Sequence, residues 1–342
     1  MRRTPTAGRT LGTALGALVS AGALLFAGSA TATAAATAAA EPAAGTPSAA
    51  VHEQSASAES LASFWTAERM RSAEPLDVLP LGASDLARLG PQSVAKGEKS
   101  TVAPTSADRT AVGPTAFPQQ GGPWSGGGAV VQTSGRVFFS FDGRTASCSG
   151  NAVTSANEST VITAGHCVKY QGSWHTDWVF VPGYHDGQAP HGQWSASQTL
   201  TTPQWEASED MNYDIGAAVV QPLNGSTLTD VVGGQGLQFN GGYNQDMYAF
   251  GFPAADPYDG EKLIYCSGAT SKDWLFSNDH GMSCNMTGGS SGGPWFAQFD
   301  EGSGTGLQAS VNSFGYVFWP NRMFGPYFGN EAQSLYQTAQ NS

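Results

Sequence analysis

The chain has 342 residues, a mass of 35.4 kDa and a formal net charge of −12. Only 12% of the residues are charged, whereas 44 are glycine and 11% are aromatic, which excludes coiled coils, long amphipathic helices and disorder of the whole chain. Residues 1–120 hold nine of the 15 basic and nine of the 27 acidic side chains, so the net charge lies entirely in residues 121–342. Because so few Lys and Arg could neutralise phosphates, we expect no nucleic-acid partner.

The N-terminus has the features of a secretory signal peptide. Arg2, Arg3 and Arg9 precede a stretch of apolar or small residues from Leu11 to Gly28, and Ala-x-Ala cleavage sites follow it. No other stretch approaches the roughly 20 apolar residues that span a bilayer. We therefore predict that residues 1–34 are a signal peptide, that the mature protein is secreted and extracellular, and that it does not contact a membrane after cleavage.

A low-complexity run of Ala, Thr, Ser and Pro follows over residues 35–58, and it has too few bulky apolar residues to fold alone. Leu61, Phe64 and Trp65 then fall at helical spacing. This spacing predicts one amphipathic helix over residues 61–73, which the proline at position 75 stops.

Residues 80–125 have no clear periodicity and are predicted to be a linker. We interpret residues 35–125 as a removable prosegment, in which Phe64 and Trp65 pack on the domain that follows as an inhibitor or a folding aid. A flexible spacer is the alternative. The prosegment interpretation predicts that the mature chain begins between Gly113 and Gly135.

Residues 126–342 are predicted to form one β domain, because short apolar runs recur there between glycine-rich turns. A short helix over Glu331–Thr338 is expected to close the chain. The predicted strands are Val137–Phe141, Val161–Thr163, Trp178–Val181, Ile215–Val220, Met247–Phe252, Leu263–Tyr265, Trp295–Phe296, Leu307–Val311 and Tyr316–Trp319.

The four cysteines, an even number in a chain with an export signal, indicate disulfides. Three connectivities are possible, and we favour Cys148–Cys167 and Cys266–Cys284, each of which closes a loop of about 20 residues. A four-cysteine metal site would need a Cys-x-x-Cys spacing that the sequence lacks, so we expect no metal.

Three short motifs carry residues suited to acyl transfer. His166 lies in Thr-Ala-Gly-His-Cys, directly after a predicted strand, and Asp214 directly precedes another. Ser291 lies within Gly-Gly-Ser-Ser-Gly-Gly-Pro, where glycines allow close approach of a substrate and backbone N–H groups can converge on an oxyanion. Asp210 is the rival acid, but it lies further from the strand. Each motif is weak alone, since such a histidine or glycine loop is often structural.

Together, the order His, Asp, Ser and the motifs Thr-Ala-Gly-His-Cys and Gly-x-Ser-Gly-Gly-Pro resemble the chymotrypsin-like (trypsin-type) serine peptidases. The segments 180–184 and 190–194 are similar to the secreted bacterial V8-like, or glutamyl-endopeptidase-like, branch. The resemblance implies an all-β fold of two antiparallel six-stranded β-barrels, with a short C-terminal helix and the active site between the barrels.

The resemblance also implies a role for each motif residue. Ser291 is the nucleophile, His166 is its base and later the acid, and Asp214 orients the imidazole. The N–H groups of Gly289 and Ser291 form the oxyanion hole. The strand that binds substrate and walls the specificity pocket corresponds to Asn312, Ser313, Phe314 and Gly315.

Two departures from the family pattern bear on regulation and specificity. Ser290 precedes the nucleophile where an aspartate is common, so it cannot pair with a newly formed N-terminus. Asn312 stands where glutamyl endopeptidases tend to place a histidine, which argues against glutamate specificity. Asn285 and Met286, near the expected pocket floor, supply no acid that would attract Arg or Lys.

We therefore predict a secreted serine endopeptidase that acts on protein or peptide substrates, as a monomer and without a cofactor. Two alternatives stay open at this point. One is a catalytically silent binding protein on the same fold, and the other is an esterase that uses the same triad.

Overall fold

Residues 49–82, 85, 94–106 and 116–342 are described in the computed structural model. The chain divides into two units, Met1–Ala43 and Ala44–Ser342, and all described residues belong to the second. The predicted signal peptide, residues 1–34, and most of the low-complexity run lie outside the described residues. Within the described part, no helix is long and apolar enough to cross a membrane.

Six antiparallel strands form a closed barrel. Their order is β12-β11-β6-β7-β8-β13, and β12 also pairs with β13, which closes the ring and removes its edges. Large apolar side chains such as Phe139, Trp178 and Leu200 fill the interior. The strands are β6 (Ser134–Phe141), β7 (Arg144–Ala152), β8 (Thr160–Thr163), β11 (Thr176–Pro182), β12 (Trp194–Thr201) and β13 (Gly216–Val220).

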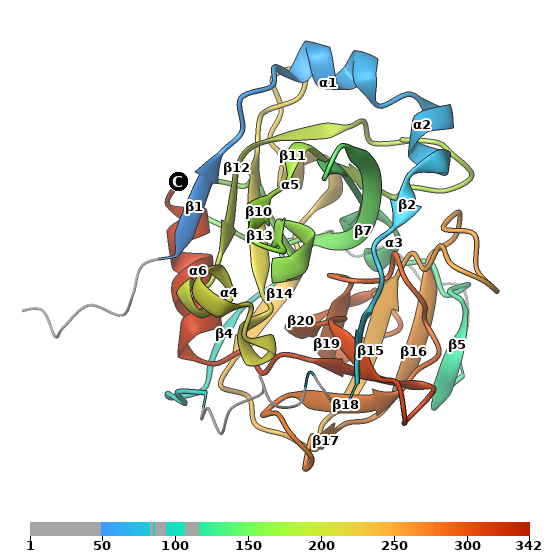
Figure 1. Ribbon diagram of the computed structural model, residues 1–342, viewed down its shortest axis with the longest axis vertical. Helices are drawn as coiled ribbons and strands as arrows, with labels where there is room; N and C mark the ends of the chain where they lie inside the picture. The colour runs from blue at the N-terminus through green and yellow to red at the C-terminus, as the bar shows by residue number, and fades with distance from the viewer. Residues whose placement is uncertain (1–48, 83–84, 86–93, 107–115) are drawn as a thin grey trace, which may run out of the picture. The chain divides into compact units, whose positions relative to one another are not determined.

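Two further sheets build the second half of the fold, below the barrel in Figure 1. The seven-stranded sheet has the order β4 (Ser100–Val102), β14 (Gly236–Phe239), β20 (Thr305–Val311), β19 (Pro294–Asp300), β15 (Asp246–Gly251), β16 (Ile264–Ala269) and β5 (Gln119–Pro123). The five-stranded sheet has the order β17 (Ser271–Lys272), β18 (His280–Ser283), β22 (Arg322–Gly325), β21 (Phe314–Tyr316) and β3 (Leu79–Leu81). The all-β prediction is confirmed, and the first barrel is closed as expected.

Short elements complete the fold. The predicted C-terminal helix is present as α6 (Asn330–Gln340), whose Leu335 and Tyr336 pack into the barrel core. The other short elements are β9 (Lys169–Tyr170), β10 (Ser173–Trp174), α3 (Val130–Thr133), α4 (Pro203–Ser208), α5 (Leu228–Val232) and 3₁₀ turns at Gly165–Cys167 and Met211–Tyr213.

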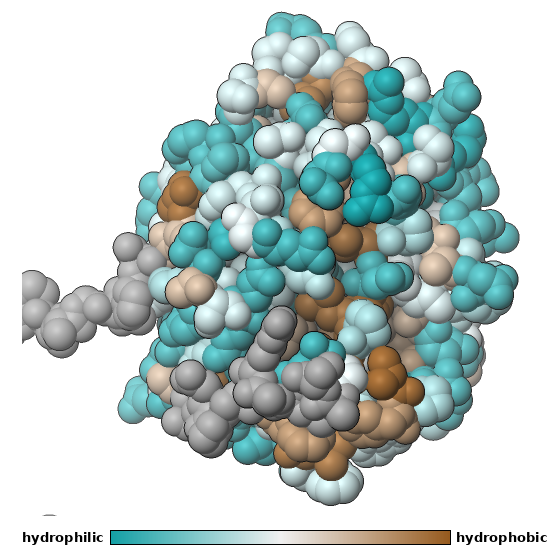
Figure 2. Space-filling model, viewed as in Figure 1, coloured by the Kyte–Doolittle hydropathy of each residue, from teal (hydrophilic) through white to brown (hydrophobic). Residues whose placement is uncertain are grey.

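One predicted strand is wrong. Strand β21 ends at Tyr316, and the chain then turns, which leaves Val317 and Phe318 exposed by 63% and 52%. An apolar run was mistaken for a strand because periodicity does not reveal which apolar residues are buried. Apolar residues are visible on this face of the molecule in Figure 2.

The segment before the barrel winds over both halves of the fold (Figure 1). Strand β1 (Ala50–Glu53) pairs with β12, and β2 (Glu74–Pro75) pairs with β7. Strand β3 then pairs with β21 in the second half. The chain therefore crosses from the barrel to the other half between residues 75 and 79.

The predicted single helix over residues 61–73 is instead two helices, α1 (Ala58–Phe64) and α2 (Ala67–Ser72). The helix breaks because Thr66 caps the second helix, its side chain accepting the N–H of Arg69. Trp65, at the break, is fully buried, and its indole N–H donates to the carbonyl of Asp177 at 2.7 Å. The predicted packing of Trp65 on the following domain is confirmed.

The prediction that residues 80–125 are only a linker is wrong for their described part. Strand β4 pairs with β14, and β5 pairs with β16 at the edge of the seven-stranded sheet. Neither strand has an alternating apolar pattern. Both are edge strands that backbone hydrogen bonds to β14 and β16 hold in place, so the sequence pattern did not reveal them.

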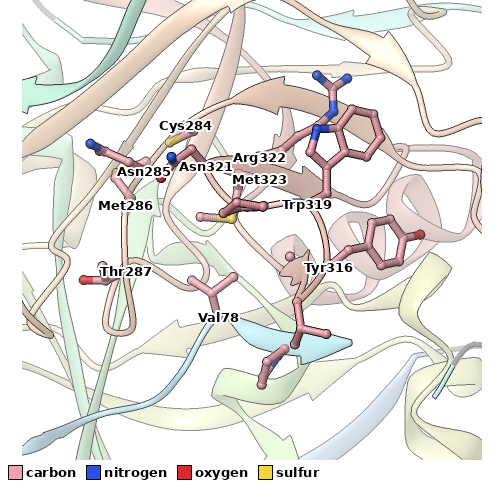
Figure 3. A pocket seen from close by; sticks show the side chains of 14 residues that line it. Val78, Cys284, Asn285, Met286, Thr287, Tyr316, Trp319, Asn321, Arg322 and Met323 are labelled. Atoms are coloured by element: carbon pink, nitrogen blue, oxygen red, sulfur yellow. The ribbon is translucent and has the colours of Figure 1, made fainter. Parts of the chain in front are cut away.

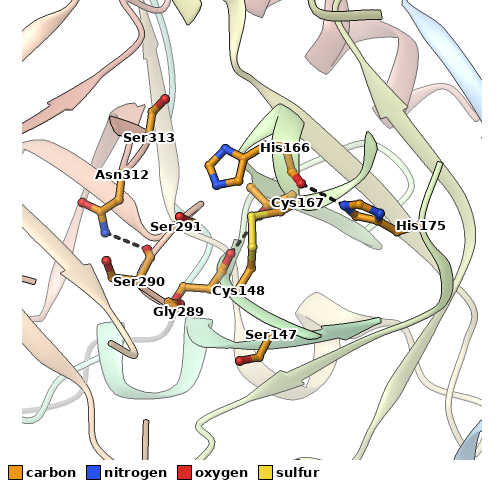
Figure 4. Close-up of a disulfide and its surroundings, with 12 residues drawn as sticks. Ser147, Cys148, His166, Cys167, His175, Gly289, Ser290, Ser291, Asn312 and Ser313 are labelled. Carbon is orange, nitrogen blue, oxygen red and sulfur yellow. Dashed lines mark hydrogen bonds between the residues drawn. A yellow bond between two sulfur atoms is a disulfide. The ribbon is translucent and has the colours of Figure 1, made fainter. Parts of the chain in front are cut away.

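Both predicted disulfides are confirmed. Cys148 on β7 bonds to Cys167 in the turn after β8, and Cys266 on β16 bonds to Cys284. The first crosslink ties the turn that carries His166 to a neighbouring strand, as Figure 4 shows. The disulfide thus fixes the backbone next to the histidine.

Asp279→Asn is expected to stabilise the protein, and more so at high pH. Asp279 is fully buried, and neither carboxylate oxygen has a hydrogen-bond partner among the described residues. Burial first, and the neighbouring Asp273 second, raise the pKa of Asp279 well above its ordinary value. Its stabilising contribution is therefore present at low pH and is lost as the pH rises through the folded-state pKa. Thermal unfolding at pH 4 and pH 8 should show the larger gain in Tm at pH 8.

The matched control is Asp300→Asn, in an exposed hairpin. Hydrogen bonds from Ser303 and the N–H of Gly302 lower the pKa of Asp300, so its amide should bring no gain at either pH. An unchanged or lower Tm of the Asp279→Asn protein at pH 8 would contradict the prediction.

Candidate active site

His166 lies in the 3₁₀ turn that follows β8 and is fully buried. The preceding residue must be glycine, because a Cβ on Gly165 would lie 2.8 Å from the Trp205 ring and 2.9 Å from the carboxylate of Asp214. The close approach of these groups places the backbone of His166 directly against Asp214.

Asp214 is a buried carboxylate that accepts three hydrogen bonds. Its Oδ2 lies 2.7 Å from His166 Nδ1, and its Oδ1 accepts the backbone N–H of His166 at 2.8 Å. The hydroxyl of Ser313, from the other half of the fold, donates to Oδ2 at 2.5 Å. With Nδ1 donating its proton to the carboxylate, the other ring nitrogen of His166 carries the lone pair. That nitrogen, Nε2, has no hydrogen-bond partner among the described residues.

Asp210, the rival acid in the sequence, lies elsewhere. Its carboxylate accepts the backbone N–H and the side-chain amide of Asn212, and so caps the 3₁₀ turn before Asp214. The structure therefore brings Asp214, and not Asp210, to His166.

The loop that carries Ser291 is tied to both halves of the fold (Figure 4). The N–H of Ser149 on β7 donates to the carbonyl of Ser291 at 2.7 Å, and the N–H of Gly292 donates to the carbonyl of Asn312 at 2.8 Å. Ser290, which replaces the familiar aspartate, donates its hydroxyl to Thr287. Since the loop is held on both sides, the position of Ser291 is fixed relative to the barrel that carries His166.

Gly289 adopts a backbone conformation that favours glycine. Its φ is +91°, and an added Cβ would lie 2.9 Å from the carbonyl oxygen of Phe252. Its N–H donates to the carbonyl of Leu76 at 2.8 Å. The predicted oxyanion donor thus already binds a peptide carbonyl, from the segment between β2 and β3.

Ser291 makes its side-chain hydrogen bond to the same segment. Its Oγ donates to the carbonyl of Asp77 at 3.3 Å, and no hydrogen bond joins it to His166. The hydrogen bond between a catalytic serine and its histidine often forms only when substrate is bound, so this geometry is compatible with a catalytic serine.

Three of the four residues predicted to bind substrate contact a peptide segment here. The carbonyl of Ser313 accepts the N–H of Leu79 at 3.1 Å, and Phe314 and Gly315 pair with Leu79 and Pro80.

Asn312 does not fit the expectation of substrate contact. Its side-chain amide donates to the carbonyls of Phe250 and Ser290, each at 2.9 Å, and its Oδ1 accepts the indole N–H of Trp295 at 2.7 Å. All its polar atoms are used inside the fold, so Asn312 positions the loop before Ser291. A single sequence could not reveal this, because it does not show which way a side chain points.

His175 is a supporting residue that lies outside the three sequence motifs. Its ring stacks on Phe139 with centroids 4.3 Å apart, and its Nε2 donates to the carbonyl of His166 at 2.9 Å. Burial lowers the pKa of His175 to about 3, so the ring is neutral at physiological pH. It supports the backbone of His166 without adding charge to the site.

A cavity of about 280 Å³ lies beside the loop of Ser291, lined by Asn285 and Met286 as expected from the sequence. Figure 3 shows the side chains around it, which come from the loop at 284–287, from residues 315–323 and from Val78. Met323 and Trp319 give it a largely apolar wall.

One group of potential metal ligands occurs among the described residues. Cys148, Cys167 and His166 offer ligand atoms within 4.8 Å of one another. The two sulfurs are joined in a disulfide, and His166 Nδ1 is hydrogen-bonded to the carboxylate of Asp214. Since metal binding by cysteine requires a thiolate, this group does not fit a metal ion.

Solved structures of similar proteins decide the family. The protease Anisep from Arthrobacter nicotinovorans is 45% identical, covers 63% of this chain and 98% of its own, and superimposes with a TM-score of 0.59. A thermostable serine protease, AL20, from an extremophilic microorganism is 41% identical, with coverages of 63% and 99% and a TM-score of 0.59. The chain belongs to the chymotrypsin-like serine proteases.

More distant matches to this protease add less. A Glu endopeptidase structure shares 15% identity over 66% of this chain and 99% of its own, with a TM-score of 0.53, and so supports the fold alone. No family model matches the chain. An extracellular metalloprotease of Bacillus subtilis (strain 168) is 34% identical over 101 residues, which are 29% of this chain. The match spans only 31% of that curated relative.

Asp214→Asn should lower kcat of the processed protease by about 10⁴-fold. Three donors surround the carboxylate, namely Nδ1 and N–H of His166 and the hydroxyl of Ser313. The amide of asparagine must turn its NH₂ toward one of these donors. If the NH₂ faces Nδ1, the imidazole would carry its proton on Nε2 and could not accept the proton of the serine. Steady-state kinetics on a peptide substrate would measure the loss.

Asp210→Asn is the matched control, because its carboxylate only caps a turn and an asparagine can cap equally well. A larger loss for Asp210→Asn than for Asp214→Asn would show that the acid has been misassigned.

Proposed function

We propose that the protein is a secreted serine endopeptidase that hydrolyses peptide bonds through Ser291, His166, Asp214 and an acyl-enzyme intermediate. The observation that carries the proposal is the buried contact of 2.7 Å between His166 Nδ1 and Asp214, which leaves Nε2 unpartnered within the described site. Figure 4 draws the His166 ring on the side of Ser291. A neutral imidazole oriented in this way is suited to accept a hydroxyl proton.

The proposed reaction has two halves. Ser291 Oγ attacks the carbonyl carbon of the substrate while His166 Nε2 takes its proton, and the N–H groups of Gly289 and Ser291 bind the oxyanion. His166 returns the proton to the amine as the C–N bond breaks, which leaves an acyl ester on Ser291. Water, deprotonated by His166, attacks this ester and restores the free serine. Asp214 stabilises the imidazolium in both halves of the reaction.

Secretion and removal of a prosegment are part of the proposal. The Arg-rich start of the chain, its apolar stretch and two disulfides support export to an oxidising compartment. Relatives that match 63% of the chain support a prosegment before the protease, since residues 126–342 would account for that share. Strand β5 pairs with β16, and Trp124 packs among Phe250 and Tyr265, so we expect the cut on the N-terminal side of Gln119.

The two alternatives from the sequence make different demands on the site. A silent binding protein would need neither the buried pair of His166 and Asp214 nor an N–H of Gly289 directed at a carbonyl. An esterase would need both, so kinetics must separate it from a peptidase. The name of the metalloprotease relative suggests metal chemistry for that protein, but the disulfide-bonded cysteines here argue against carrying it over.

Ser291→Ala should abolish the peptidase activity of the folded protein, with a loss on the order of 10⁶ in kcat. A serine-directed phosphonate should label the processed native protein but not this variant. Ser303→Ala, in the hairpin between β19 and β20, is the matched control and should be labelled like the native protein.

Processed native protein that resists the phosphonate, or a folded Ser291→Ala variant with a tenth of the activity, would overturn the proposal. Parallel assays on matched ester and amide substrates decide between esterase and peptidase. Hydrolysis of the ester alone would favour the esterase.

A further inference from the structure

The segment between β2 and β3 crosses the candidate active site. Three hydrogen bonds hold it to residues of the site: Gly289 N–H to the carbonyl of Leu76 at 2.8 Å, Ser291 Oγ to the carbonyl of Asp77 at 3.3 Å, and Leu79 N–H to the carbonyl of Ser313 at 3.1 Å. Figure 1 shows this segment running between the two halves of the fold. It therefore occupies the groups that a substrate would need.

We propose that residues 76–81 are an intramolecular inhibitor, bound to the peptide-binding site in a register that cannot be cleaved, with Val78 at the pocket that selects the substrate side chain. The proposal rests on the proposed function and adds to it a form of regulation and a class of substrate.

The register of the segment explains why the serine does not cut it. Attack requires that one carbonyl group place its oxygen at the oxyanion donors and its carbon at the nucleophile. Here the two roles fall on consecutive residues: the N–H of Gly289 binds the oxygen of Leu76, whereas Ser291 Oγ donates to the oxygen of Asp77. The proton of Ser291 points to that oxygen instead of to His166. Neither peptide bond is presented for attack.

Strand pairing on both sides fixes this register. Strand β2 pairs in parallel with β7, and the N–H of Leu76 donates to the carbonyl of Ser147 at 2.9 Å. Strand β3 pairs in parallel with β21. A shift of the segment along the site would break the hydrogen bonds on both sides.

Apolar contacts add to the strand pairing. Leu79 and Leu81 are buried among Trp205, Met211 and Phe314. Pro80 between them is exposed, as expected for a strand with one buried face. These two leucines therefore anchor the C-terminal end of the inhibitor segment.

Val78 lines the cavity of about 280 Å³ and packs on the cluster that contains Met286 and Met323 (Figure 3). Two polar side chains of the cavity, Asn285 and Arg322, bond to residues outside it, whereas Arg322 Nε has no hydrogen-bond partner among the described residues. Asn285 Oδ1 accepts the hydroxyl of Tyr258, and Arg322 donates to Ser271 and stacks on Trp319.

Since burial of an unpaired charge is costly, such a cavity favours apolar side chains. Val78 forms part of the wall and leaves the cavity volume open, so larger residues such as leucine or methionine also fit. We therefore expect the protease to prefer apolar residues on the acyl side of the bond that it cuts.

The first test uses a synthetic peptide of residues 73–82 and the processed protease. The peptide should inhibit competitively against a chromogenic substrate and should stay intact by mass spectrometry. The same peptide with Val78→Asp should inhibit at least tenfold more weakly, because the aspartate would be buried without a partner. Non-competitive inhibition, no inhibition, or cleavage between residues 76 and 79 would each overturn the proposal.

The second test uses the intact chain and its rate of labelling by a serine-directed phosphonate. The intact chain should react at least tenfold more slowly than the processed protease, and Val78→Asp in the intact chain should restore much of the rate. Val51→Asp makes the same change on β1, where the side chain is 45% exposed, and should stay as slow as the native chain.

Equal rates for intact and processed chains would overturn the inhibitor. A processed protease that does not react at all would instead overturn the proposed function, so the two failures are distinguishable. If Val78→Asp does not fold, the comparison of native intact and processed chains still decides.

A substrate panel tests the pocket. Peptides with Val, Leu or Met before the cut bond should be hydrolysed with kcat/KM roughly 100-fold higher than peptides with Glu or Lys there. A preference for Glu would overturn the apolar pocket and would point to Arg322 as the group that receives the carboxylate.

Discussion

The buried carboxylate of Asp214 is the constraint on which the arrangement of the two halves depends. A charge removed from water is costly unless its lone pairs are satisfied, and Asp214 is fully buried. Two of its donors come from His166 in the barrel, and the third is Ser313 in the other half. The two halves must therefore keep one fixed relative position for the carboxylate to receive all three hydrogen bonds. Because Nδ1 of His166 is bonded to Asp214 in this arrangement, Nε2 is the ring nitrogen without a hydrogen-bond partner among the described residues.

The loop of Ser291 is also fixed by the need of buried polar groups for hydrogen-bond partners. The N–H of Ser149 on the barrel binds the carbonyl of Ser291, and Asn312 binds the carbonyl of Ser290. Because peptide groups in a buried loop must find partners, the loop has one satisfactory conformation, and glycine at position 289 permits it. An N–H directed at an incoming carbonyl is therefore built into the fold. The inhibitor segment uses that donor without presenting its own bonds for cleavage.

The sequence predicted those parts of the site that are marked locally. His166 and Ser291 stand in short motifs of small residues and glycines, and apolar runs predicted β6, β8, β11 and β13 of the barrel and β15, β16, β19 and β20 of the seven-stranded sheet. Strands β7 and β12 were missed because they are rich in serine and threonine, and their pairing with neighbours decides their structure. Asn312 was predicted to face substrate, although its side chain binds Trp295. The direction in which the Asn312 side chain points depends on tertiary contacts, which a local sequence pattern does not show.

The inhibitor segment could not be predicted for a related reason. Residues 76–81 read Leu-Asp-Val-Leu-Pro-Leu, which matches no motif, and all three of their hydrogen bonds to the site use backbone groups of the segment. Their partners lie more than 200 residues away along the chain. Only the fold defines which carbonyl meets which donor.

Attachment to the rest of the chain determines how tightly this segment must bind. A tethered segment acts at a high effective concentration, so a few backbone hydrogen bonds and two buried leucines suffice to keep the site closed. The chain before the inhibitor segment is also held on the barrel, through the pairing of β1 with β12 and through Trp65 in the cluster with Phe138. A single cut before Gln119 removes the tether but leaves these contacts in place. Opening of the site therefore requires the released segment to dissociate or to be degraded, and the contacts of Trp65, remote from Ser291, set how long the cut protein stays closed.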